Sequence, residues 1–249
     1  MPIPTQRVLE KLDSYLQKND YQSAKRHLLY WLSEAEIAGD GSGKLLLLNE
    51  LMGLTRKLGE ESQALSYAQT ALEQVRKMGI EDNIGAATTY LNTGTVYKAF
   101  GKAEAALPLF EKATAIYEQD LAPNDDRLGG LYNNMALALV DLNRYEEAEQ
   151  YYGTAIAIME TLPGKEPEVA ITWLNLASCA EVRYDRDTAN IYIEEYAAAA
   201  MALLDKGKDR QDGNYAFVCE KCAPVLEHFG YTDYAAILAE RCRRIYEGT

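Results

Sequence analysis

Apolar and small residues recur with the spacing of amphipathic helices along residues 132–155. Residues three or four positions apart share one face of an α-helix, because each turn contains 3.6 residues. Two such faces flank residues 141–143, where polar residues typical of a turn interrupt the pattern. The segment therefore predicts a helical hairpin. Its apolar face is formed by Tyr132, Met135, Ala136 and Leu139 before the turn and by Ala148, Tyr152 and Ala155 after it.

The same hairpin pattern returns along most of the chain, most clearly at residues 90–113 upstream and 173–193 downstream. Tyr90, Gly101 and Ala106, for example, stand where Tyr132, Asn143 and Ala148 stand one repeat later. A single hairpin cannot bury its apolar face, so successive hairpins must stack. We therefore expect one all-α domain over residues 1–249, a right-handed superhelical solenoid of about six hairpins. They are expected at residues 5–38, 45–80, 87–120, 129–162, 170–203 and 216–249, with residues 39–44 as a flexible linker.

These repeats resemble the tetratricopeptide repeat, in which an aromatic residue, a small residue four positions later and a Gly or Asn turn follow one another. The long repeat period and the segments YNNMA and YEEAE are similar to those of kinesin light chains. The resemblance covers nearly the whole chain and is weakest at both ends. It implies a scaffold that binds proteins rather than an enzyme.

Asparagine occupies the same place in three successive repeats, at Asn92, Asn134 and Asn175. Each follows a core aromatic residue by two positions, which places it about 200° around the helix, away from the packing face. In kinesin light chains and bacterial peptide-pheromone receptors, which these repeats resemble, the equivalent Asn lines the concave groove and holds a peptide backbone. An amide offers both a donor and an acceptor, as one peptide unit requires. The predicted peptide-binding set is completed by Glu50, Leu91, Thr95, Lys98, Asn133, Leu137, Asp141, Leu174, Ser178 and Glu181.

The charge and hydropathy of the chain disfavour nucleic acid and membranes as partners. The formal net charge is −13, whereas binding to a phosphate backbone requires clustered Lys and Arg. The one dense basic cluster, at Arg241, Arg243 and Arg244, is expected to be a solvated helix face. No run of 18 apolar residues is present, so we expect no membrane span. The first residues lack a charged and then apolar signal region, which predicts a cytoplasmic location.

Residues that could support catalysis or metal binding are few. The two histidines, His27 and His228, lie in distant repeats, and no HExxH or GxSxG motif occurs. Cys219 and Cys222 form a CxxC pair, but no second pair completes a zinc site. The repeat pattern places Cys222 in the core, so we expect the cysteines to act as small apolar residues. We expect a protein without enzymatic activity, cofactor or metal.

Two functional hypotheses follow from these observations. The first is a non-catalytic scaffold that binds an extended peptide segment of a partner protein in its concave groove. The alternative is a peptide-sensing regulatory receptor, or an assembly subunit that acts through its end faces. In the last predicted helix, Leu238 and Ile245 are expected on the outer face beside Arg241. Such an apolar strip predicts weak homodimerisation through the C-terminal helix.

Overall fold

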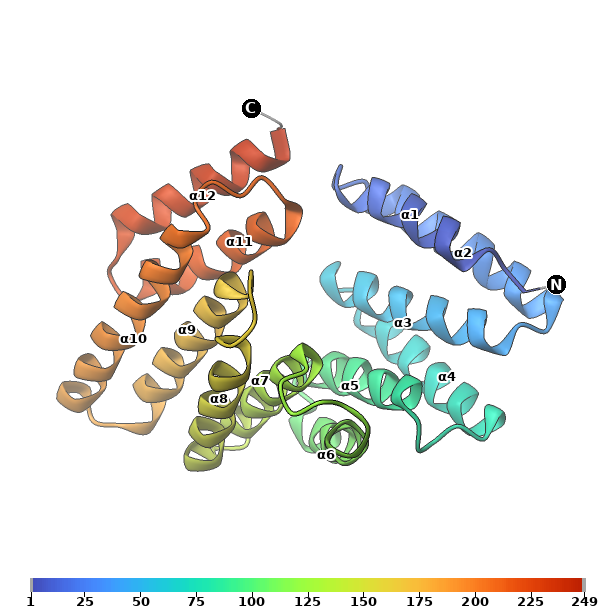
Figure 1. Ribbon diagram of the computed structural model, residues 1–249, viewed down its shortest axis with the longest axis horizontal. Coiled ribbons are helices and arrows are strands. Elements are labelled where there is room, and N and C mark those ends of the chain that lie inside the picture. Colours follow the sequence, from blue (N-terminus) through green and yellow to red (C-terminus); the bar gives the residue numbers. More distant parts are fainter. Residues whose placement is uncertain (1, 248–249) are drawn as a thin grey trace. The chain divides into compact units, whose positions relative to one another are not determined.

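The computed structural model describes residues 2–247, and within this range every regular element is an α-helix (Figure 1). The chain divides into two compact units, residues 1–120 (unit 1) and residues 121–249 (unit 2). Unit 1 contains α1 (Thr5–Leu16), α2 (Tyr21–Ala38), α3 (Gly41–Lys57), α4 (Glu61–Met78), α5 (Ile84–Ala99) and α6 (Ala103–Asp120). Unit 2 contains α7 (Asp126–Asp141), α8 (Tyr145–Met159), α9 (Glu166–Arg183), α10 (Arg186–Lys206), α11 (Gly213–His228) and α12 (Thr232–Glu247). The expectation of an all-α helical-repeat fold is confirmed.

Consecutive helices pair as hairpins, and the hairpins stack within each unit. In unit 1, α3 packs against α2, α4 and α5, so the first helices of two successive hairpins touch. In unit 2, α9 packs in the same way against α7, α8, α10 and α11. Each unit therefore buries its apolar faces between neighbouring hairpins, as expected for stacked repeats.

The residues that the sequence pattern assigned to the core of the hairpin of α7 and α8 are buried. In the hairpin of α7 and α8, Ala136, Ala148, Tyr152 and Ala155 have no exposed surface, and Leu139 is 1% exposed. Small residues at the crossing are needed because a side chain there would collide with the partner helix. At Gly94 of α5, for instance, an added Cβ would lie 2.6 Å from the Phe110 ring of α6.

The turns within the hairpins explain the Gly and Asn spacing. Asn19, Gly59, Gly101, Asn143 and Gly230 all have φ between 54° and 88°. This left-handed conformation is open to Gly and is tolerated by Asn, which is why these two residues recur at hairpin turns.

The helix starts differ from the expected repeat ranges, and an Asp or Asn side chain caps the starts of α3, α5, α7 and α11. The helices α3, α5, α7, α9 and α11 each begin about one helical turn before the corresponding predicted repeat. In the case of α3 the expected linker at residues 39–44 is wrong, since the helix already begins at Gly41. Asp40 caps it by accepting a hydrogen bond from Gly43 N at 2.9 Å, which outweighs the low helix propensity of two glycines.

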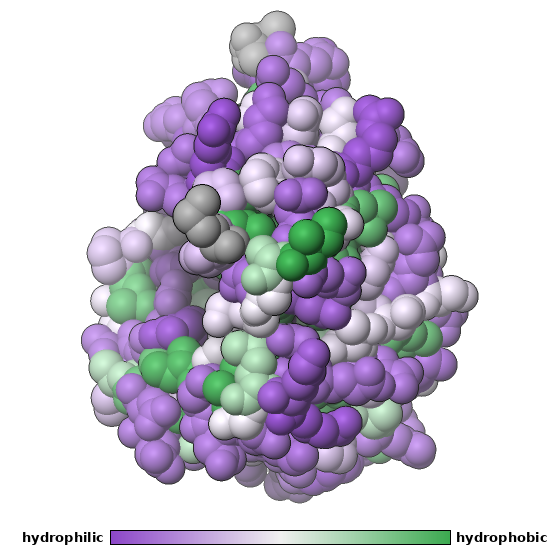
Figure 2. Space-filling view, turned by 90° about the vertical axis from the view of Figure 1, so that its right-hand side faces the viewer, coloured by the Kyte–Doolittle hydropathy of each residue, from purple (hydrophilic) through white to green (hydrophobic). Residues whose placement is uncertain are grey.

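The surface agrees with the strongly acidic composition. The face of the molecule shown in Figure 2 is mainly hydrophilic, with small separate apolar patches. No helix among residues 2–247 is long and apolar enough to cross a membrane.

Candidate functional site in the first helices of the hairpins

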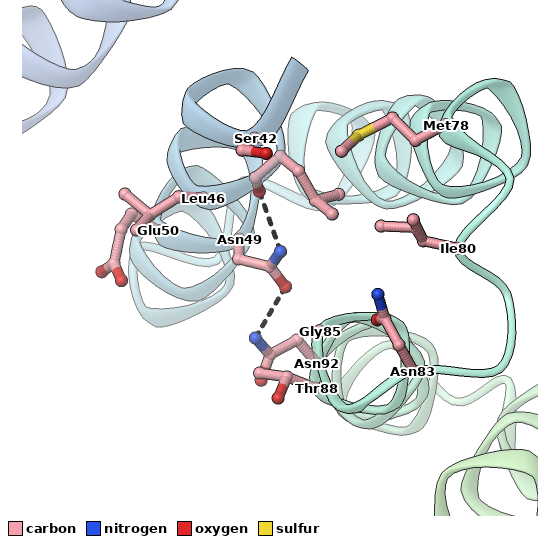
Figure 3. Close-up of a pocket in the computed structure, with 11 residues that line it drawn as sticks. Ser42, Leu46, Asn49, Glu50, Met78, Ile80, Asn83, Gly85, Thr88 and Asn92 are labelled. Carbon is pink, nitrogen blue, oxygen red and sulfur yellow. Dashed lines mark hydrogen bonds between the residues drawn. The ribbon is translucent and has the colours of Figure 1, made fainter. Parts of the chain in front are cut away.

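A pocket of about 480 Å³ opens in unit 1 between α3, α5 and the segment that joins α4 to α5 (Figure 3). We call it the α3–α5 pocket. Met78 and Ile80 form one side of it, opposite the amides of Asn49 and Asn92. Glu50 lies at its rim, on the far side of α3 from Met78 and Ile80. Its remaining lining residues are Ser42, Leu45, Leu46, Asn83, Gly85 and Thr88.

The orientation of the Asn92 amide is set by a chain of hydrogen bonds that begins at the buried Thr89 hydroxyl. Thr89 donates its proton to Gly85 O at 3.0 Å, so its Oγ1 can only accept from Asn49 Nδ2 at 3.1 Å. The second proton of Asn49 Nδ2 goes to Leu45 O at 2.8 Å. Asn49 must therefore turn its Oδ1 toward α5, where it accepts from Asn92 Nδ2 at 2.8 Å. We call this network the Thr89–Asn49–Asn92 relay.

The relay leaves Asn92 with an acceptor for a further partner. Asn92 is half-buried, and no residue within the described part of the chain donates to its Oδ1. One proton of its Nδ2 is also unused by the relay. Asn92 was expected to face away from neighbouring helices. Instead it lies at the contact between two first helices, fixed on one side and available on the other.

Glu50 is a half-buried carboxylate without a counter-ion among residues 2–247. Burial raises the pKa of its carboxyl group, and the negative charge of Asp13 on α1 raises it further. Desolvation of a charge without a compensating partner is unfavourable. Its carboxylate is thus suited to a cationic group from outside the chain.

Unit 2 repeats part of this amide arrangement. Asn175 on α9 donates from Nδ2 to Oδ1 of Asn133 on α7 at 3.0 Å, the counterpart of the bond between Asn92 and Asn49. Asn134 differs, because its Nδ2 donates to Gly130 O of its own helix at 2.8 Å.

The remaining predicted site residues behave in different ways. Leu91, Thr95 and Lys98 of α5 are half-buried, as are Leu137 of α7 and Ser178 of α9, while Asp141 is exposed. The hydroxyls of Thr95 and Ser178 donate to Leu91 O and Leu174 O of their own helices, so they can serve a ligand only as acceptors.

Contacts within unit 2 occupy two of the predicted peptide-binding residues, Leu174 and Glu181. Leu174 is wrong as a groove residue, because it is 2% exposed and lies in the core cluster of unit 2. It follows the core aromatic Trp173 directly, and the packing of α9 against its neighbouring helices covers it. Glu181 is exposed, but its carboxylate lies 2.8 Å from Nε2 of His228 on α11. It is thus committed to an interaction within unit 2.

The cysteines belong to the core. Cys179, Cys219 and Cys222 are buried, and Cys242 is partly buried. Burial raises the pKa of the Cys179 and Cys219 thiols to about 11 and also raises the pKa of Cys222. These three thiols are therefore protonated at neutral pH and poor nucleophiles. Among residues 2–247, no three His, Cys, Asp or Glu side chains are grouped so that they could hold a metal ion.

The expected apolar strip on the C-terminal helix is wrong. Leu238 of α12 has no exposed surface and belongs to the core of unit 2, while Ile237 is 47% exposed. Arg241 does not face outward but bonds Asp205 at 2.7 Å and the Tyr215 hydroxyl at 3.0 Å. The helix buries Ala235 and Leu238, so the face expected to point outward is partly the packed one. The predicted homodimer contact therefore loses its structural basis.

The hairpins, their left-handed turns and their stacked first helices define an all-α helical repeat protein. The tetratricopeptide repeat model matches residues 45–119 and 127–202. The chain belongs to the tetratricopeptide repeat family, which confirms the resemblance.

Kinesin light chain proteins are among its relatives. Protein KINESIN LIGHT CHAIN-RELATED 3 of Arabidopsis thaliana is 30% identical over 165 residues, covering 65% of this chain. The chain spans only 24% of the length of that relative.

Three solved structures share the fold of the chain at low sequence identity. BtubC (BKLC) from P. vanneervenii has a TM-score of 0.60 and 22% identity, with 93% of this chain and 91% of that chain covered. NprR in complex with its cognate peptide NprX has a TM-score of 0.61 and 16% identity, covering 96% and 66%. A Rap protein complexed with Competence and Sporulation Factor has a TM-score of 0.58 and 17% identity, covering 96% and 73%.

The sequence pattern missed Asn49 and Thr89 as members of the site. Asn49 and Asn133 occupy the same position in hairpins two repeats apart, so their correspondence was visible in the repeat alignment. Their pairing with Asn92 and Asn175 depends on how far one first helix is displaced along the next, which a repeat alignment does not contain.

Proposed function

We propose that the protein is a non-catalytic scaffold that binds an extended peptide segment of a partner protein. The polar side chains of the first helices hold the peptide backbone, with Asn92, Asn134 and Asn175 as the principal contacts. The observation that carries this proposal is the orientation of Asn92 at the wall of the α3–α5 pocket. No residue between positions 2 and 247 donates to its Oδ1, while its Nδ2 is anchored on Asn49.

A backbone partner fits this arrangement better than a small polar metabolite. A peptide unit presents one N–H donor and one C=O acceptor, and a fixed amide offers the complement of both. The same relation between neighbouring first helices recurs at Asn133 and Asn175 in unit 2, which suits a ligand with a repeating backbone. NprR and the Rap protein, which share the fold, are complexed with NprX and with Competence and Sporulation Factor. The alternative of a peptide-sensing receptor or assembly subunit stays a prediction.

The proposal is tested by replacing Asn92, Asn134 and Asn175 together by Ala. The probe is a library of N-acetylated, C-amidated random decapeptides passed over the immobilised full chain, with retained peptides quantified by mass spectrometry. Each lost hydrogen bond to a peptide is worth about 0.5–1.5 kcal/mol, so retention should fall at least about tenfold. The matched control is Asn190→Ala, which removes an exposed amide from the second helix α10.

The fold of the triple variant is checked by thermal unfolding followed by circular dichroism. The free protein loses only the amide contacts at Asn49 and Asn133 and the hydrogen bond from Asn134 to Gly130 O, so the helical signal should persist at room temperature. A triple variant that retains the same peptides as the wild type would place the binding surface elsewhere.

A further inference from the structure

The rim of the α3–α5 pocket carries a negative charge that the fold does not neutralise. The carboxylate of Glu50 is half-buried, and no cationic side chain of residues 2–247 pairs with it. The exposed carboxylate of Asp13 on α1 lies close enough to disfavour ionisation of Glu50. Within the described part of the chain, neither of these two carboxylates from neighbouring hairpins forms an ion pair with a cationic side chain.

The opposite side of the same pocket is apolar. Met78 and Ile80 line it, on the far side of Asn49 from Glu50 (Figure 3). Asn49 and Asn92 lie between the apolar side and the acidic rim, where their amides are joined. An occupant therefore meets three surfaces in order: an apolar wall, a pair of amides and a carboxylate.

These surfaces discriminate between occupants. An acidic residue at the rim would be repelled by Glu50 and Asp13, and an apolar residue there would desolvate Glu50 without replacing its water. A lysine or arginine provides the missing positive charge, and its aliphatic stem can lie along Leu46 beside Glu50. Successive side chains of an extended peptide point in opposite directions, so neighbouring residues can reach the two sides of the amide pair.

We propose that the α3–α5 pocket selects an apolar residue followed or preceded by a lysine or arginine. The apolar residue enters between Met78 and Ile80, the peptide backbone bonds Asn92, and the basic residue pairs with Glu50. This inference rests on the proposed function and names the chemistry of its ligand.

The test uses the same capped decapeptide library and the full chain. The most strongly retained peptide that contains arginine is resynthesised with citrulline in place of that arginine, which keeps the shape and removes the charge. Dissociation constants of both peptides are measured by fluorescence polarisation for the wild type, Glu50→Gln, Glu50→Lys and Glu111→Gln. Glu111 is the matched control, since it is an exposed carboxylate of unit 1 on α6.

We expect the library to enrich Lys and Arg beside an apolar residue. Glu50→Gln should weaken the arginine peptide about three- to tenfold and leave the citrulline peptide within about twofold, as expected for one partly desolvated ion pair. Glu50→Lys should shift enrichment toward Asp and Glu, whereas Glu111→Gln should behave as the wild type. Equal weakening of both peptides by Glu50→Gln, or enrichment without basic residues, would overturn the inference while leaving peptide binding intact. A library from which nothing is retained would overturn this inference and the proposed function together.

Discussion

At the scale of single residues, the most informative side chain is Thr89, which contacts no pocket surface itself. Thr89 is fully buried, and its hydroxyl donates its proton to Gly85 O. The hydroxyl oxygen can therefore only accept from Asn49, which sets the orientation of the Asn49 amide and through it that of the Asn92 amide. A binding amide oriented before the ligand arrives loses less rotamer freedom on binding. Thr89 is in this sense a positioning residue.

Substitutions at Thr89 test whether the relay sets the orientation of the Asn92 amide, which itself remains present in both variants. Thr89→Val keeps the volume but removes the acceptor, so Asn49 loses one hydrogen bond, at a cost of about 1 kcal/mol of unfolding free energy. Thr89→Ser keeps the acceptor and should keep the orientation. We expect the side-chain amide resonances of Asn92, followed by ¹⁵N NMR, to move in the Val variant and to stay near their wild-type positions in the Ser variant. Unchanged Asn92 resonances in Thr89→Val would show that the relay does not set its orientation.

Residue roles were only partly visible in the sequence. The column of Asn92, Asn134 and Asn175 follows directly from the repeat register, because a helical position and its spacing from core aromatics are local properties. The repeat register does not contain the difference between them: Asn92 and Asn175 bond an amide of a neighbouring first helix, whereas Asn134 bonds Gly130 of its own helix. Leu174 was misassigned for a related reason: burial at the edge of a first helix is decided by its neighbour, not by its own helix.

At the scale of elements, helix pairing and turn positions were predictable, and helix ends were less so. Five of the hairpin turns in the described residues contain Gly or Asn in a left-handed conformation, which few other residues adopt, whereas the turn between α9 and α10 at Tyr184 and Asp185 does not. The start of α3 was not predicted, because its first residues are rich in glycine and resemble a linker, although Asp40 before them is a favourable capping residue. For α12, apolar residues occur on more than one side, so periodicity alone did not assign Leu238 to the core.

The register of α12 gives a prediction with an internal control. Leu238→Glu would bury a carboxylate without a partner in the core of unit 2, so the free energy of unfolding should fall by roughly 3 kcal/mol or more. Ile237→Glu changes the adjacent residue, which is 47% exposed, and should cost less than about 0.5 kcal/mol. Urea denaturation followed by circular dichroism measures both. Similar losses for the two variants would mean that α12 is rotated from the register described.

At the scale of the whole molecule, the net charge of −13 sets the long-range conditions of binding. An acidic protein attracts basic segments and repels acidic ones before contact. At 0.1 M salt these forces are largely screened between charges more than about 10 Å apart. The charge of the partner should therefore appear in the association rate as well as in affinity.

Ionic strength provides the corresponding measurement. Raising the salt concentration from about 0.05 M to about 0.5 M should slow association of the arginine peptide several-fold in stopped-flow fluorescence, because the screening length falls from above about 10 Å to below it. The citrulline peptide, which lacks the charge, should change less. An equal response of the two peptides would show that the field of the protein does not act on the basic residue.

The contact between Ile3 and Asp40 gives the first residues of the chain an influence beyond their own hairpin. Asp40 accepts hydrogen bonds from both Ile3 N and Gly43 N, each at 2.9 Å, and the Ile3 side chain is 7% exposed. A displacement of the segment before α1 that broke this contact would thus loosen the start of α3, the helix that carries Asn49 and Glu50. Conformational change ahead of the first hairpin would in this way be coupled to the capacity of a pocket whose residues come from the second and third hairpins.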